Sequence, residues 1–116
     1  MSKNRCDPVE RQVDAYNRRD IDAFLACYAP DTVIEDASGS VVMRGRDAMR
    51  TAYSELFRTS PRLRAEVTTR IRIGDHVIDE ERVTGRRGSS DDLRAVAIYH
   101  VANDLIDRVR LITDEP

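Results

Sequence analysis

Residues 63–73 alternate between apolar and polar side chains over eleven positions, which limits this part of the chain to a half-buried strand. The positions on one face are Leu63, Ala65, Val67, Thr69, Ile71 and Ile73. Further strand-like segments follow at 76–85, 93–101 and 105–113, separated by turn-forming residues. The second half of the chain is therefore predicted to be an antiparallel sheet whose apolar face needs a covering layer.

The first half of the chain has the pattern of helices. Asp7 followed by Pro8 is typical of a helix start, and Asp20 can cap a second helix. The apolar stripe of that second helix runs to Tyr28, and Pro30 is expected to end it. A short hairpin at 32–36 and 41–43 and a third helix at 46–58 complete the predicted elements.

Helices followed by strands indicate the α+β class, with three N-terminal helices packed on a curved antiparallel sheet. The length fits a single domain over residues 1–116, and residues 1–6 are expected to form a flexible N-terminus. Cys27 falls in a helical stripe and is interpreted as a core residue, and two cysteines do not make a disulfide scaffold.

Composition excludes several classes of function. The 19 basic and 21 acidic residues are spread evenly and give a net charge of −2, which argues against nucleic-acid binding. No apolar run is long enough to cross a membrane, and no cluster has metal-ligand spacing. We expect a soluble cytoplasmic protein without a metal or other cofactor.

Four segments resemble the first half of the NTF2-like superfamily, and within it the SnoaL-like and ketosteroid-isomerase-like proteins. They are Asn17 to Phe24, Tyr28-Ala29-Pro30-Asp31, Val33-Ile34-Glu35-Asp36 and Arg44-Gly45-Arg46-Asp47-Ala48. The resemblance implies a conical α+β barrel with a deep apolar pocket, usually a homodimer. It is specific for the fold but weak for function, because the superfamily holds isomerases, cyclases, hydrolases and domains without known activity.

The resemblance also implies catalytic positions. Asp36 matches the general base at the end of the first strand, and the oxyanion tyrosine of the first helix would fall near Gln12, one turn before Tyr16. The second oxyanion donor falls within 94–97, where no carboxylic acid occurs. Tyr99, central on a long strand, is the other candidate donor. The alternative for Asp36 is a capping role in the turn that follows it.

The acidic run Asp79-Glu80-Glu81 interrupts a strand pattern. If Val77 and Val83 face inward, Asp79 and Glu81 do so as well, and a buried Glu81 needs an Arg or Tyr partner. The alternative is a salt-bridged sheet face at a dimer interface. The candidate pocket residues are Gln12, Phe24, Tyr28, Ile34, Met43, Tyr53 and Glu81.

Three functions remain open from the sequence, the third being a subunit-type adaptor whose open sheet recruits another protein. One is a cofactor-free acid/base isomerase for a steroid- or polyketide-like carbonyl compound, with Asp36 as base and Tyr99 or Tyr16 as hydrogen-bond donor. The alternative is a non-catalytic ligand-binding or dimerisation module. The isomerase, or the module in its ligand-binding form, would hold a small apolar ligand. A homodimer is expected because both faces of the strand at 93–101 carry apolar residues.

Overall fold

The structure, a computed structural model, describes residues 7–114, so the flexible N-terminus predicted for residues 1–6 lies outside the described residues. The helices are α1 (Pro8–Arg18), α2 (Ile21–Leu25), α3 (Gly45–Thr59) and the short 3₁₀ helix η1 (Arg86–Gly88). The strands are β1 (Tyr28–Glu35), β2 (Val41–Arg44), β3 (Arg64–Ile73), β4 (His76–Thr84), β5 (Leu93–Ala102) and β6 (Leu105–Thr113). Within 7–114, no helix is long and apolar enough to cross a membrane.

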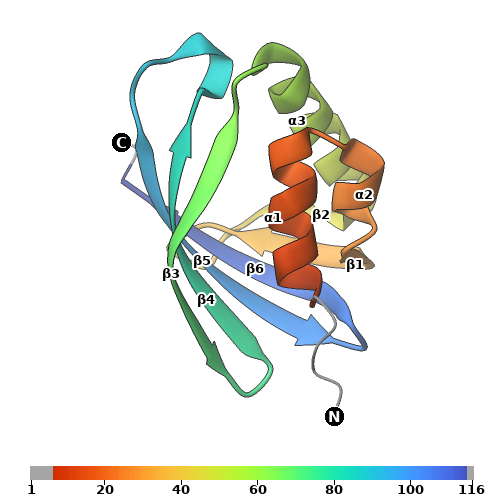
Figure 1. Ribbon diagram of the computed structural model, residues 1–116. Helices are drawn as coiled ribbons and strands as arrows, with labels where there is room; N and C mark the ends of the chain where they lie inside the picture. The colour runs from red at the N-terminus through yellow and green to blue at the C-terminus, as the bar shows by residue number, and fades with distance from the viewer. Residues whose placement is uncertain (1–6, 115–116) are drawn as a thin grey trace.

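All six strands form one curved sheet in the order β2-β1-β6-β5-β4-β3. Figure 1 shows α1, α2 and α3 on one side of this sheet, which bends around them. The predicted α+β class, with three helices on a curved sheet, is confirmed. The inward face of the sheet and the apolar faces of the helices enclose the core between them.

One pairing departs from the predicted antiparallel sheet. β1 runs parallel to β6, with Val33 opposite Arg108 and Glu35 opposite Arg110. Parallel neighbours require a long connection, and here the chain passes through β2, α3 and the β3–β5 meander before it returns as β6. The alternation of apolar and polar side chains is the same in parallel and antiparallel strands, so the sequence pattern could not predict this pairing.

Both predicted helix caps are present. Asp7 accepts a hydrogen bond from the backbone N–H of Glu10 at 2.9 Å, and Asp20 accepts one from that of Ala23 at 3.1 Å. Each carboxylate satisfies a backbone N–H that has no partner inside its helix. These caps fix where α1 and α2 begin, and therefore which side chains they turn toward the sheet.

The second helix is shorter than predicted. It ends at Leu25, and Tyr28 is already the first residue of β1. The pairing of β1 with β6 skips from Tyr28 to Val33, so Pro30 lies where the ladder is interrupted. A proline has no N–H to donate to a ladder, and an irregular stretch of strand accommodates it. Tyr28 thereby points into the core from the sheet rather than from a helix.

Only some of the alternating apolar side chains at 63–73 are buried. Leu63 and Ala65 are buried, but Ile71 and Ile73 are 52% and 66% exposed. The pairing with β4 shifts between Val67 and Thr69, which breaks the strict period at that point. The far end of the β3–β4 hairpin also extends away from the helices (Figure 1), so nothing in this layer covers its isoleucines.

Aromatic rings dominate the core beneath the helices. Phe24 lies at their centre, with its ring centroid 4.8 Å from that of Tyr53 and 5.1 Å from that of Tyr28. Tyr16 and Phe57 complete the cluster at 6.0 and 5.8 Å from Phe24. The tilted and edge-on arrangements are those that aromatic pairs favour. This cluster forms one wall of the cavity described next.

Candidate functional site

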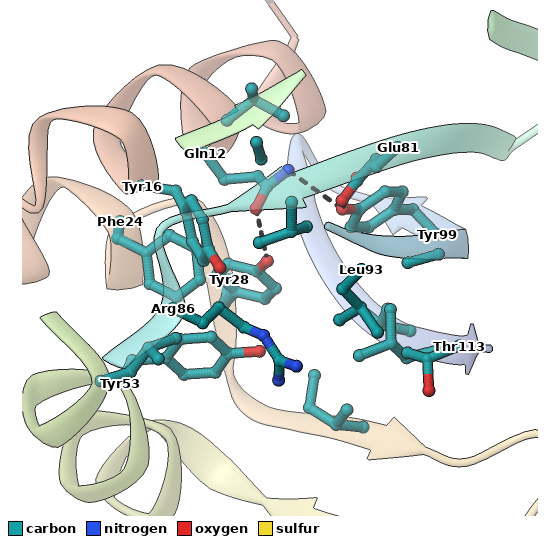
Figure 2. Close-up of a pocket in the computed structure, with 18 residues that line it drawn as sticks. Gln12, Tyr16, Phe24, Tyr28, Tyr53, Glu81, Arg86, Leu93, Tyr99 and Thr113 are labelled. Carbon is teal, nitrogen blue, oxygen red and sulfur yellow. Dashed lines mark hydrogen bonds between the residues drawn. The ribbon is translucent and has the colours of Figure 1, made fainter. Parts of the chain in front are cut away.

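A cavity of about 170 Å³ lies between the helices and the inward face of the sheet. Its walls are mainly apolar and aromatic, with a few polar groups that point inward (Figure 2). The lining residues are Gln12, Val13, Tyr16, Phe24, Tyr28, Ile34, Tyr53, Leu56, Ala65, Glu81, Val83, Arg86, Leu93, Ala95, Tyr99, Val109, Leu111 and Thr113. Such a composition is typical of a small-molecule site.

Four polar side chains from four elements form a hydrogen-bonded chain in the cavity wall. The Tyr28 hydroxyl donates to Oε1 of Gln12 at 2.9 Å, and Nε2 of Gln12 donates to the Tyr99 hydroxyl at 3.1 Å. The Tyr99 hydroxyl donates in turn to Oε2 of Glu81 at 3.3 Å. Figure 2 shows this chain leading from β1 through α1 to β5 and β4. It ends on the one carboxylate among the described residues that line the cavity.

Glu81 owes its position to the alternation of β4. Val77, Asp79, Glu81 and Val83 are all buried, as predicted for residues that share the inward face of one strand. Arg82 is exposed on the opposite face. Glu81 therefore faces the aromatic and aliphatic walls of the cavity rather than a charged sheet surface.

The two inward acids have different partners. Asp79 is 0% exposed and forms a two-pronged ion pair with Arg70, with N–O distances of 2.6 and 2.8 Å. Glu81 is 8% exposed and bonds to the neutral hydroxyl of Tyr99. The guanidinium of Arg70 thus compensates the charge of Asp79 directly, whereas Glu81 meets mainly apolar surroundings.

This environment changes the acidity of Glu81. Burial raises the pKa of its carboxyl from 4.5 to about 7, and the negative charge of Asp79 adds to the rise. The hydrogen bond from Tyr99 and the charge of Arg70 oppose it and lower the pKa. A carboxyl group with a pKa near neutrality can both accept and return a proton at physiological pH.

The tyrosines of the cavity remain protonated at neutral pH. Burial raises the pKa of Tyr53 to about 12, and it raises those of Tyr16, Tyr28 and Tyr99 above their usual range. Each therefore keeps its O–H. The hydroxyls of Tyr28 and Tyr99 already donate to Gln12 and Glu81, whereas those of Tyr16 and Tyr53 belong to residues that line the cavity outside this hydrogen-bonded chain. Tyr99 is the one whose hydroxyl contacts Glu81.

The structure corrects the expectation for Asp36. Its Oδ1 accepts hydrogen bonds from the N–H and hydroxyl of Ser38 at 2.9 and 2.6 Å and from the N–H of Ser40 at 3.1 Å. The bonds from Ser38 and Ser40 hold the pKa of Asp36 below its usual value. Asp36 is not among the residues that line the cavity, and its carboxylate instead stabilises the β1–β2 turn.

Most of the other predicted site residues line the cavity. The cavity brings together all of the predicted pocket residues except Met43, and it includes Tyr16 and Tyr99 as well. Met43 packs against the core from β2 without lining the cavity. Arg86 was missed, because it lies in a segment interpreted only as a polar loop. Within residues 7–114, no group of three or more His, Cys, Asp or Glu side chains is placed to hold a metal ion.

Helices that cover one face of a curved six-stranded sheet, with a cavity between them, define an NTF2-like cone. The profile of the SnoaL-like domain matches residues 9–109, and the chain belongs to this family. A comparison with curated proteins gives no match.

Solved structures similar to this chain agree on the fold. A cystatin-fold protein from Novosphingobium aromaticivorans is 26% identical with a TM-score of 0.82, over 90% of this chain and 94% of that one. An NTF2-like protein from Cytophaga hutchinsonii is 14% identical with a TM-score of 0.78, over 97% and 95% of the two chains. A protein with a ketosteroid-isomerase-like fold from Catenulispora acidiphila, solved with trimethylamine, is 18% identical with a TM-score of 0.76, over 96% and 85%.

Proposed function

We propose that this chain is a cofactor-free acid/base catalyst that moves a proton on a small carbonyl compound, with Glu81 as the proton carrier. The single observation that carries the proposal is the placement of Glu81. It is a buried carboxyl group in a largely apolar cavity, bonded to a tyrosine hydroxyl, with a pKa of about 7. The ketosteroid-isomerase-like fold of structural neighbours supports the class of reaction as an analogy.

In the proposed reaction, the ionised Glu81 carboxylate takes a proton from the carbon next to the substrate carbonyl. The electron pair of that C–H bond moves to the carbonyl oxygen and forms an enolate. Once Glu81 carries the proton, the Tyr99 hydroxyl is released from donating to it and can donate to the enolate oxygen. Gln12 holds the Tyr99 oxygen in place. Return of the proton to a different carbon completes an isomerisation.

The size of the cavity favours a single-ring substrate over a steroid. Its volume is about 170 Å³, and a cavity of about 150 Å³ in another protein holds one benzene molecule. Pockets for larger ligands usually span roughly 300–1,000 Å³. A six-membered cyclic ketone therefore matches the cavity in this conformation.

Cyclohex-3-enone tests the proposal directly. A proton leaves C2 and one returns at C4, which gives the conjugated cyclohex-2-enone, followed by its ultraviolet absorbance. We expect Glu81→Gln to lower kcat/KM about 10²- to 10⁴-fold, the usual contribution of a positioned proton carrier. Tyr99→Phe is expected to lower it roughly 10²-fold. Asp36→Asn is the matched control because it removes a carboxylate outside the cavity, and it should retain wild-type activity. Full activity in Glu81→Gln would refute the proposal.

One observation favours the alternative of a non-catalytic binding module. The polar side chains from Tyr28 to Glu81 already satisfy one another without a ligand, as the buried polar networks of purely structural sites do. Saturable binding of cyclohexanone without turnover of cyclohex-3-enone would favour this alternative.

A further inference from the structure

Two formal charges of opposite sign line the described cavity, and the proposed reaction uses only one of them. Glu81 is the first, and Arg86 from η1 is the second. Figure 2 shows the guanidinium of Arg86 directed into the cavity, on the side where the Tyr53 hydroxyl lies. The positive charges of Arg86 and Arg87 also lower the pKa of Tyr16, in part opposing the larger rise caused by burial. The cationic field of η1 therefore reaches the cavity interior.

The backbone around η1 holds Arg86 in this position. Gly85 adopts a φ of +76°, and a Cβ there would lie 2.2 Å from the carbonyl oxygen of Arg62, so the chain passes close to the start of β3. The backbone N–H of Arg87 donates to the hydroxyl of Ser60 at 2.8 Å. Ser60 is fully buried at the end of α3. η1 is thus fastened on both sides of Arg86 to the elements that surround the cavity.

We propose that the ligand of this cavity is a small, single-ring carboxylate whose carboxylate group is bound by Arg86. A guanidinium presents parallel N–H donors that match the two oxygens of a carboxylate. The aromatic wall around Phe24 packs against the apolar ring. The expected ligand is therefore amphipathic rather than purely apolar.

This inference deepens the proposed function, since it places the carboxylate at Arg86 and the reacting carbon near Glu81. Recognition by Arg86 is nevertheless a binding event, and it does not require Glu81 to be catalytic. The two ideas can therefore fail separately.

The charge of Glu81 adds a pH dependence. Ionised Glu81 repels a second carboxylate in the same cavity, so binding is expected to tighten as Glu81 becomes protonated below about pH 7. The charged or titratable groups around Glu81 are Asp79 on β4, Arg70 on β3, Arg86 of η1 on the wall of the same cavity, and the tyrosines at 16, 28, 53 and 99. Arg70 is paired with Asp79, and the tyrosines stay protonated. Glu81 is thus the group of this set that changes charge near neutral pH.

Isothermal titration with benzoate and benzamide tests the inference. The two probes have nearly the same shape, and only benzoate is charged between pH 6 and 8. At pH 6, we expect the wild type to prefer benzoate and Arg86→Gln to lose about 10- to 100-fold of benzoate affinity, with benzamide changed less than about threefold. Arg86→Lys should retain part of the preference. Arg87→Gln is the matched control, because it removes the same charge from an exposed neighbour and should keep most of the affinity.

Several results would overturn the inference. They are wild-type affinity for benzoate in Arg86→Gln, an equal loss in Arg87→Gln, or no saturable benzoate binding by the wild type. In Glu81→Gln, benzoate affinity should no longer change between pH 6 and pH 8. If it still changes, Glu81 is not the group that makes binding depend on pH. If Arg86→Gln loses benzoate while the wild type does not isomerise cyclohex-3-enone, recognition stands and the proposed function fails. If Glu81→Gln abolishes isomerisation while Arg86→Gln binds benzoate normally, the proposed function stands and this inference fails.

Discussion

Glu81 should make the folded protein less stable as the pH rises from about 4.5 to about 7. Its carboxyl has a raised pKa of about 7 in the folded state and about 4.5 when solvated. The folded state therefore binds the proton more tightly than the unfolded state, and the associated stability is fully present below pH 4.5. It is lost as the pH rises toward 7, because the charged form must then remain buried.

The expected magnitude follows from that difference. One pKa unit corresponds to about 1.4 kcal/mol, so the free energy of unfolding should fall by about 3 kcal/mol between pH 4.5 and pH 7.5 relative to a variant without this carboxyl. Glu81→Gln keeps the shape and cannot ionise. Its stability should therefore lack this component, while all other titrating groups contribute equally to both proteins.

Urea unfolding followed by far-ultraviolet circular dichroism measures the effect, since the chain has no tryptophan. Wild type and Glu81→Gln are compared at half-unit steps from pH 4.5 to pH 8. The difference between their free energies of unfolding should change by about 3 kcal/mol and level off above pH 7.5. Parallel profiles over the whole range would refute the reasoning that burial raises the pKa of Glu81.

Three further predictions concern the buried ion pair of Asp79, the glycine before η1 and the oligomeric state. Arg70→Met leaves Asp79 buried without its cation and should lower the free energy of unfolding by about 3–5 kcal/mol in urea titrations; a loss below about 1 kcal/mol would contradict the buried pair. Gly85→Ala should destabilise more than Gly88→Ala, because both glycines have positive φ but only the first meets a backbone atom at 2.2 Å. Equal melting temperatures for these two variants would show that the close approach of Gly85 to the backbone of Arg62 does not limit stability. Sedimentation at micromolar concentration should give the mass of two chains, since the half-buried outer face of β5 carries apolar residues; a mass of one chain would argue against the homodimer.

Most of the helices and strands could be predicted from local sequence patterns. The caps at Asp7 and Asp20 obey the chemistry of helix ends, and the alternation in β4 placed Asp79 and Glu81 on the buried face. The parallel pairing of β1 with β6 could not be predicted in this way, because it joins segments far apart in the chain. Tyr28 was assigned to a helix for a similar reason, since tertiary pairing with β6 overrides a local apolar stripe.

The candidate site was less accessible from the sequence. A strand-end aspartate can serve as a base or cap a turn, and only the positions of Ser38 and Ser40 decide that Asp36 does the latter. The acidity of Glu81 depends on what surrounds it in space. The sequence could place it on the same face as Val77 and Val83, but it could not identify it as the titrating group. Arg86 carried one available signal, the preceding Gly85, whose freedom to adopt positive φ lets the loop turn over the cavity.

The proposed function requires Glu81 to be a carboxyl group that titrates near neutral pH inside the cavity. Carbon-13 NMR of the glutamate side-chain carboxyls, titrated from pH 3 to pH 9 and assigned by the loss of one signal in Glu81→Gln, tests it most directly. We expect the Glu81 signal to titrate with a pKa of about 7. A Glu81 signal that titrates near 4.5, the value of a solvated carboxyl, would show that Glu81 is not the proton carrier proposed for the cavity.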